Sequence, residues 1–182
     1  HTRLRTVTEV QTCALPISSV LGIDAAERNI LIAARHAAAN AAPARYRHAL
    51  PEDLVAEQRL FDVVLSLEVV EHVANVSEFL SALAAIVAPG GLLAVGTLNR
   101  TPLSYLKAIL GAEHLLGWLP KGTHDWSKFV RPSELDQHLS QLGFERVETR
   151  GVSLNPMTIR WSITGSTDTN YLQVHRKRRM MD

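Results

Sequence analysis

The sequence predicts a doubly wound α/β domain, in which helices cover both faces of a mostly parallel sheet. Apolar segments of strand length alternate with segments of helical periodicity from residue 19 onward. The strand segments are almost entirely apolar instead of alternating, which is typical of parallel strands covered on both faces. At 182 residues with 46% hydrophobic content, the chain is long enough for one such domain and too apolar to be disordered throughout.

The elements follow one another in a regular order. We expect strands at 19–24, 45–50, 61–67, 91–99, 144–154 and 170–177, and helices at 25–42, 51–58, 75–88 and 132–143. Pro89 and Gly90 predict a turn before the fourth strand, since proline fixes φ and glycine accepts positive φ. The last two strands are expected to be antiparallel at the sheet edge. A leucine-rich helical insertion is expected near residues 102–130.

Bulk composition excludes several classes of protein. A net charge of +1 gives no electrostatic reason to expect a nucleic-acid partner, and the basic end HRKRRMMD is interpreted as a frayed, solvated terminus. The single cysteine, Cys13, cannot form an internal disulfide, which favours a reducing compartment. No apolar run approaches the ~18–20 residues that would cross a bilayer. Residues 1–18 resemble a translated sequencing adapter and are expected to be foreign or disordered, leaving the domain proper at 19–182.

Asp24 ends the first expected strand, and two interpretations fit it equally well. An acidic residue at the carboxyl end of a strand in an open α/β sheet can accept hydrogen bonds from both ribose hydroxyls of a nucleotide-like cofactor. Asp24 and Glu27 also match a capping box at the start of a helix, which needs no ligand.

The stretch SLEVVEHV places Glu68, Glu71 and His72 after the strand at 61–67. If the chain is helical there, the three side chains lie on one face, because residues three and four apart are neighbours on a helix. Two carboxylates and an imidazole could then hold Mg²⁺, Mn²⁺ or Zn²⁺. The alternative is a solvated helix start with His72 as a hydrogen-bonded packing residue.

An apolar helix and a set of polar residues near the strand ends are two further candidates for a functional role. The helix expected at 103–119 is conspicuously apolar and contains Trp118, so it could lie in a lipid headgroup region or roof a lipidic substrate pocket, or it could simply be a core helix. Asn99-Arg100 and the segment 122–126 are expected to bring polar groups to the same strand-end face, with ordinary turn chemistry as the alternative.

Several motifs together resemble one enzyme family. FDVVLSLEVVEHV, GGLLAVGTLNRT, GAEHLLGWLPKGTHDWSKFVRPSEL, GVSLNPMT and NYL, spread over about Val20 to Arg176, are similar to the ubiquinone-biosynthesis O-methyltransferases. That resemblance implies a Rossmann-like fold that uses S-adenosylmethionine to methylate a phenolic hydroxyl on a polyprenylated catechol or hydroxyphenol.

The resemblance also implies roles for individual residues. Asp24 would bind the cofactor ribose, and Leu67 would lie beside its adenosyl or methionyl part. Glu68, Glu71 and His72 match a metal-binding motif, with Mg²⁺ as the expected cation, and His72 or Glu71 would act as general base without metal. The apolar helix at 103–119 would touch the membrane, which implies a cytoplasmic enzyme peripheral on the inner membrane, mitochondrial in a eukaryote. Other ubiquinone-biosynthesis enzymes are expected partners.

The beginning of the chain departs from the family pattern. Family members carry a glycine-rich loop after their first strand, whereas residues 7–17 read VTEVQTCALPI and no glycine precedes Gly22. Because such glycines let the backbone approach the cofactor, we expect the first strand and this loop to be missing and activity to be impaired. Two non-catalytic alternatives are a lipid-surface binding module and an assembly subunit with a methyltransferase-like fold.

Overall fold

The computed structural model describes residues 19–105, 126–155, 158 and 160–179 of the chain. The chain divides into two compact units, residues 1–50 and 51–182, which are described separately. The expected insertion helix at 103–119 and the segment 122–125 lie outside the described residues, except for a short helix α4 (Pro102–Ser104) and its C-cap Tyr105.

Unit 1 is a βαβ unit. Strand β1 (Val20–Asp24) is followed by helix α1 (Glu27–Ala39) and strand β2 (Ala44–His48), and the two strands are parallel with Asp24 opposite His48. This order confirms the first three predicted elements. The predicted capping box is wrong, because the N-cap of α1 is Ala26 and its helix start makes no side-chain cap hydrogen bond.

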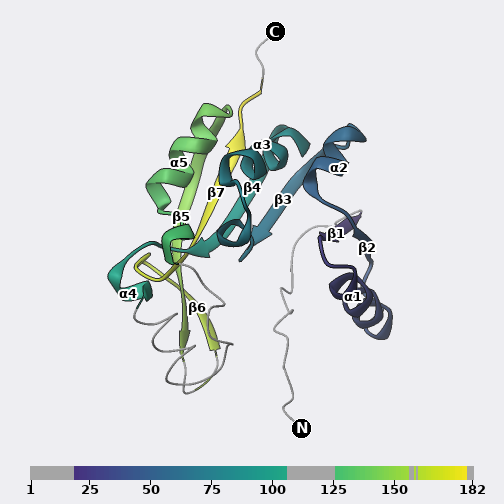
Figure 1. Ribbon diagram of the computed structural model, residues 1–182, viewed down its shortest axis with the longest axis horizontal. Coiled ribbons are helices and arrows are strands. Elements are labelled where there is room, and N and C mark those ends of the chain that lie inside the picture. The colour runs from purple at the N-terminus through teal and green to yellow at the C-terminus, as the bar shows by residue number, and fades with distance from the viewer. Residues whose placement is uncertain (1–18, 106–125, 156–157, 159, 180–182) are drawn as a thin grey trace. The chain divides into compact units, whose positions relative to one another are not determined.

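Unit 2 contains a five-stranded sheet in the order β3-β4-β7-β5-β6, as Figure 1 shows. Its strands are β3 (Phe61–Leu67), β4 (Val87–Leu98), β5 (Phe144–Asn155), β6 (Arg160–Thr164) and β7 (Asn170–Lys177). Its helices are α2 (Pro51–Ala56), the 3₁₀ turn η1 (Val70–His72), α3 (Val76–Ile86), α4, the 3₁₀ turn η3 (Trp126–Lys128) and α5 (Pro132–Gln141). Only β3 and β4 pair in parallel within this sheet; the other three pairings are antiparallel.

Helices α3 and α5 lie side by side over one face of the unit 2 sheet, where α3 contacts β3 and β4 and α5 contacts β5 and β7. Because strand side chains alternate between faces, the residues beneath these helices come from alternate positions in register across neighbouring strands. This covered row is buried and consists of Val64, Ser66, Leu93, Val95, Thr97, Tyr171, Gln173 and His175. Its polar members place hydrogen-bonding groups inside the core, close to the strand ends.

The antiparallel part of the sheet differs from the prediction in three ways. Strand β7 lies between β4 and β5 and is not at the edge. The edge is β6, whose sequence RWSIT the sequence analysis left unassigned. The basic end is not frayed over the described residues, because β7 continues to Lys177 and His175 is fully buried.

The proline start and glycine stop predicted for α5 are confirmed, whereas the turn predicted before the fourth strand is wrong, because β4 already begins at Val87 and includes Pro89 and Gly90. Gly90 has φ +80°, and the ladder with β3 shifts register between Phe61 and Val63, so the Pro-Gly segment forms an excursion within β4. Helix α5 has Pro132 in its first turn, and Gly143 beyond its end has φ +83°, as predicted for a proline start and a glycine stop.

Candidate active site at the carboxyl ends of strands β3 and β4

The ends of three strands meet at one edge of the unit 2 sheet. The Glu68 amide N–H, just beyond β3, donates to the Gly96 carbonyl of β4 over 2.8 Å. Leu98 at the end of β4 pairs with Asn170 at the start of β7. Polar residues at these three positions therefore share one edge, where open α/β sheets bind their ligands.

The backbone after β3 is not the helix that the sequence analysis assumed for SLEVVEHV. Glu68 has φ +55°, a left-handed conformation that non-glycine residues rarely adopt. A single 3₁₀ turn, Val70–His72, follows it. The predicted arrangement of Glu68, Glu71 and His72 on one helix face is therefore wrong. Strained backbone of this kind concentrates at functional sites, where the surrounding structure maintains it.

Glu71 is the buried member of this motif, with 3% of its surface exposed. Its Oε2 accepts a hydrogen bond of 2.7 Å from the hydroxyl of Thr97, which is itself fully buried on β4. Its Oε1 is buried without a hydrogen-bond partner in the described part of the chain. A carboxylate held by one oxygen with the other unsatisfied offers an open acceptor position for a further hydrogen-bond donor or a cation.

Glu68 lies close enough to Glu71 for their ionisations to interact. Burial of the carboxyl, and then the negative charge of Glu71, raise the pKa of Glu68 to about 7, while a hydrogen bond from the Asn170 side chain opposes the shift. The residue as a whole is exposed, so water reaches it and screens part of this effect. The direction follows from geometry, because two neighbouring carboxylates resist being charged together.

His72 does not join the two carboxylates as a third ligand. The residue is exposed, and no group of three or more His, Cys, Asp or Glu side chains among the described residues could hold a metal ion. Leu67, the predicted cofactor neighbour, is 47% exposed at the end of β3. A Cβ on Gly96 would stand 3.0 Å from its Cδ2, so the glycine leaves room for the Leu67 side chain.

The loop after β4 forms a second polar cluster beside this edge. The Arg100 guanidinium pairs with the Glu134 carboxylate of α5, and the Trp126 indole N–H donates to the Thr101 carbonyl over 3.0 Å. The ring of Trp126 meets that of Tyr105 edge to face at 6.2 Å. Arg100 and Trp126 thus converge near one strand end, as predicted, while the rest of the segment 122–126 lies outside the described residues.

Tyr171, Thr97 and Asn170 are site residues that the sequence analysis missed. The buried Tyr171 hydroxyl donates to the Val130 carbonyl over 3.0 Å. Burial raises the pKa of Tyr171, and the charges of Glu134 and Glu71 raise it further, so its hydroxyl stays protonated. Thr97 lies in the motif GGLLAVGTLNRT, and Asn170 and Tyr171 lie in NYL, but the sequence analysis gave these three residues no role. The strand register, which brings them level with the end of β3, is what places them at the site.

Asp24 lies in unit 1 at the carboxyl end of β1, half-buried. Its Oδ1 accepts from the Ala26 amide N–H over 2.7 Å and its Oδ2 from the Asn29 side chain over 3.1 Å. The bond from Ala26 forms an Asx turn, because the Asp24 side chain bonds the backbone two residues on, and the Asn29 side chain adds a second donor. Each carboxylate oxygen retains a free lone-pair direction for a further donor.

Comparison with known proteins identifies the family. A family described as methyltransferase domain matches residues 8–149, well over half of the chain. The chain belongs to the methyltransferase domain family. Residues 8–149 include β1, β3 and β4 as well as the acidic motif of Glu68 and Glu71, so the acidic pair lies within the matched methyltransferase domain, while Asn170 and Tyr171 of β7 lie beyond the matched residues.

Curated relatives carry one recurrent name. The ubiquinone biosynthesis O-methyltransferase of Roseobacter denitrificans is 48% identical over 156 residues, covering 85% of this chain and 63% of its own length. That of Parvibaculum lavamentivorans is 43% identical over 162 residues, covering 89% and 64%. This methyltransferase domain thus spans somewhat less than two thirds of these relatives.

Solved structures share the fold of the methyltransferase domain. Magnesium protoporphyrin IX methyltransferase from Synechocystis with bound SAH has a TM-score of 0.60 at 19% identity, covering 87% of this chain and 64% of that one. A possible histamine N-methyltransferase from Thermotoga maritima has a TM-score of 0.61 at 18% identity, covering 90% and 75%. These likenesses confirm the predicted α/β fold class.

Proposed function

We propose that the whole protein transfers a methyl group from S-adenosylmethionine to a phenolic oxygen on a polyprenylated catechol or hydroxyphenol of ubiquinone biosynthesis. The curated relatives support the reaction class and the pathway. The observation that carries the proposal is the acidic pair at the strand ends, in which Glu71 is buried, held by Thr97 and unsatisfied at Oε1.

The acidic pair would move the proton that the reaction must remove. A phenol has a pKa near ~10, so it is mostly protonated and weakly nucleophilic at neutral pH. Glu68, with a pKa of about 7, can accept the phenolic proton at neutral pH. The phenolic oxygen then gains the methyl carbon, and the proton resides on a Glu68 carboxylate oxygen, from which it can also bond Glu71 Oε1. Glu71 or His72 would serve as the base if the substrate approached from their side.

Two residues each have chemistry that suits one part of the proposed cofactor. Asp24 retains carboxylate lone pairs that suit ribose hydroxyls, and Leu67 offers an exposed apolar side chain for the adenosyl or methionyl part. When bound, S-adenosylmethionine supplies a sulfonium methyl group that leaves a neutral thioether behind. The chain's residues supply binding and orientation, which place the oxygen and the methyl carbon in line.

A divalent cation, with Mg²⁺ as the expected ion, fits two of the three residues first expected to hold it. Glu68 and the unsatisfied Oε1 of Glu71 are oxygen donors of the kind Mg²⁺ prefers, whereas His72 does not lie with them. Such a cation would supply Lewis-acid stabilisation of the phenolate. The carboxylates would then serve as ligands, and proton removal would fall to water or His72.

Membrane contact is part of this proposal. A polyprenylated substrate resides in a bilayer, so we propose that the segment 103–119 touches the membrane surface and that the enzyme is peripheral on the cytoplasmic side of the inner membrane, or on the mitochondrial inner membrane in a eukaryote. Other ubiquinone-biosynthesis enzymes would be its neighbours. Among the described helices, none has the length and hydropathy needed to span a bilayer.

A direct test measures transfer of labelled methyl groups to a short-tailed polyprenyl catechol. We expect Glu68→Gln to slow transfer by about 10²-fold or more, the scale of a lost acid–base group, while Glu78→Gln at an exposed position of α3 leaves it unchanged. The same assay on a version whose residues 1–18 are replaced by the equivalent residues of the Roseobacter relative tests whether this segment limits activity.

If calorimetry shows that neither the present chain nor this version binds the cofactor, the result would contradict the proposal and favour an assembly subunit. Vesicle binding that persists without any methyl transfer would favour a lipid-surface module.

A further inference from the structure

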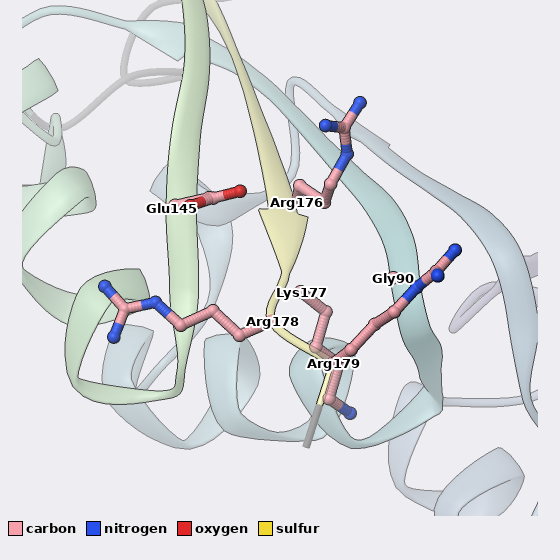
Figure 2. Close-up of a pocket in the computed structure, with 6 residues that line it drawn as sticks. All are labelled: Gly90, Glu145, Arg176, Lys177, Arg178 and Arg179. Atoms are coloured by element: carbon pink, nitrogen blue, oxygen red, sulfur yellow. The ribbon is translucent and has the colours of Figure 1, made fainter. Parts of the chain in front are cut away.

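The far end of β7 carries a run of basic side chains that line an open pocket. Arg176, Lys177, Arg178 and Arg179, together with Gly90 and Glu145, enclose about 460 Å³ (Figure 2). This volume lies in the range of small-molecule sites, about 300–1,000 Å³. Here the lining is predominantly cationic, which is unlike the apolar lining of most such sites.

Hydrogen bonds hold the backbone around this pocket in place. The Lys177 ammonium donates to the carbonyls of Ala84 and Val87, both over 2.8 Å, and so joins β7 to the end of α3. The Arg178 amide N–H donates to the Gly143 carbonyl over 2.9 Å, which fixes the chain beyond the strand. Gly90 matters too, because a Cβ there would stand 3.0 Å from Nε of Arg179.

Ion pairs among the described residues leave the arginines of this pocket unneutralised. Glu145 is the single acidic residue among the lining side chains, and within the described residues the guanidinium groups of Arg176, Arg178 and Arg179 form no ion pair. Figure 2 shows these groups extending to different sides of the strand end. One small anion could therefore contact only one or two of these guanidinium groups. A ligand with several anionic groups could contact more of them and neutralise more of their charge.

The pocket is separate from the acidic pair. Arg176 pairs with Leu92, in the middle of β4 where its ladder with β7 begins, while Asn170 pairs with Leu98 at the end of β4. Glu68 and Glu71 lie at that latter end, so the length of the β4 ladder separates the two sites. A ligand at the basic pocket would not occupy the position proposed for the phenolic substrate.

We propose that this pocket binds a ligand carrying several phosphate groups, either a soluble polyphosphate ester or a group of anionic lipid headgroups. Guanidinium groups bind phosphate oxygens through paired N–H donors, which distinguishes them from lysine point charges. Since these arginines form no ion pair with any residue that the structure describes, ligand binding breaks none there. The inference is independent of the methyl-transfer proposal, because it rests on no residue of the acidic pair.

The test compares two probes and two matched variants of the full chain. The probes are sodium tripolyphosphate, measured by calorimetry, and phosphatidylglycerol–phosphatidylcholine vesicles, measured by co-sedimentation against phosphatidylcholine alone. R176Q/R179Q removes two pocket charges, and R45Q/R160Q removes two exposed charges elsewhere. At several-fold attraction per basic residue, we expect the pocket variant to bind about tenfold more weakly, and the control within about twofold of the parent.

The outcomes separate the two sources of phosphate. Tripolyphosphate binding that depends on the pocket supports a soluble ligand, and pocket-dependent vesicle binding supports lipid headgroups. R176K/R179K keeps the charge but loses the paired N–H donors, so it should bind more weakly than the parent and more tightly than R176Q/R179Q, which also controls for misfolding of the glutamine variant. Binding of neither probe by the parent chain, or equal loss in the two glutamine variants, would overturn the inference.

Discussion

Thr97→Val tests the hydrogen bond that holds the buried carboxylate. Valine has nearly the shape of threonine, so packing on β4 is retained while the 2.7 Å bond to Glu71 Oε2 is lost. Oε1 already lacks a partner in the described part of the chain, so the variant leaves both oxygens of a 3% exposed carboxylate unsatisfied.

The expected cost follows from the charge of the acceptor. A hydrogen bond to a charged group contributes about 1.5–3 kcal/mol, compared with about 0.5–1.5 kcal/mol for a neutral pair. We therefore expect Thr97→Val to lower the free energy of unfolding by about 1.5–3 kcal/mol at pH 7.5. In a Glu71→Gln background, where the acceptor is neutral, the same substitution should cost about 1 kcal/mol less.

Urea unfolding followed by tryptophan fluorescence is the assay. All three tryptophans lie in residues 51–182, so their emission reports the unit that contains Thr97 and Glu71. A loss below about 0.5 kcal/mol, or an equal loss in the two backgrounds, would refute the view that Thr97 stabilises a buried charged carboxylate.

Three further predictions concern a buried histidine, a tightly packed glycine and a partly exposed ion pair. Burial lowers the pKa of His175 despite its contact with Asp136, so the unfolded chain binds a proton that the native state resists. The free energy of unfolding should therefore fall as the pH drops through about 6.5. Urea unfolding repeated from pH 8 to 5 should show a smaller dependence on pH in His175→Leu. Gly91→Ala should lower the free energy of unfolding by about 2 kcal/mol or more in thermal melts, because a Cβ there would stand 2.8 Å from the Asp62 carbonyl oxygen. In the control Gly165→Ala the new Cβ meets open space, so the change should stay within about 0.5 kcal/mol. Equal effects of the two substitutions would contradict this reasoning. A double-mutant cycle with Arg100→Met and Glu134→Gln should give a coupling of about 0.5–1 kcal/mol, since both side chains are partly exposed, and no coupling would show that the pair only fills space.

Local sequence chemistry predicted most of the elements. The strand FDVVLSL was predicted with its observed bounds, and α5 between Pro132 and Gly143 followed from its proline start and glycine stop. These signals are local, so they do not depend on which strands become neighbours. The order of the antiparallel strands does depend on tertiary pairing, and the place of β7 inside the sheet was accordingly missed.

The candidate site was predicted in part for the same reason. Glu68 and Glu71 stood out as charges after an apolar strand, and the structure brings their carboxyls together. The assumption of a helix failed because Glu68 adopts φ +55°, which sequence propensity disfavours and tertiary contacts impose. Thr97 and Asn170 reach the site through strand register alone, so no spacing in the sequence connects them to Glu71.

The pH dependence of methyl transfer tests the central claim most directly. If Glu68 accepts the phenolic proton, the rate at saturating substrate should fall on the acid side with an inflection near pH 7, where burial and the charge of Glu71 place the pKa of Glu68. In Glu68→Gln that inflection should disappear and the remaining rate should be lower by about 10²-fold. An unchanged acid limb in Glu68→Gln, at an unchanged rate, would contradict the account.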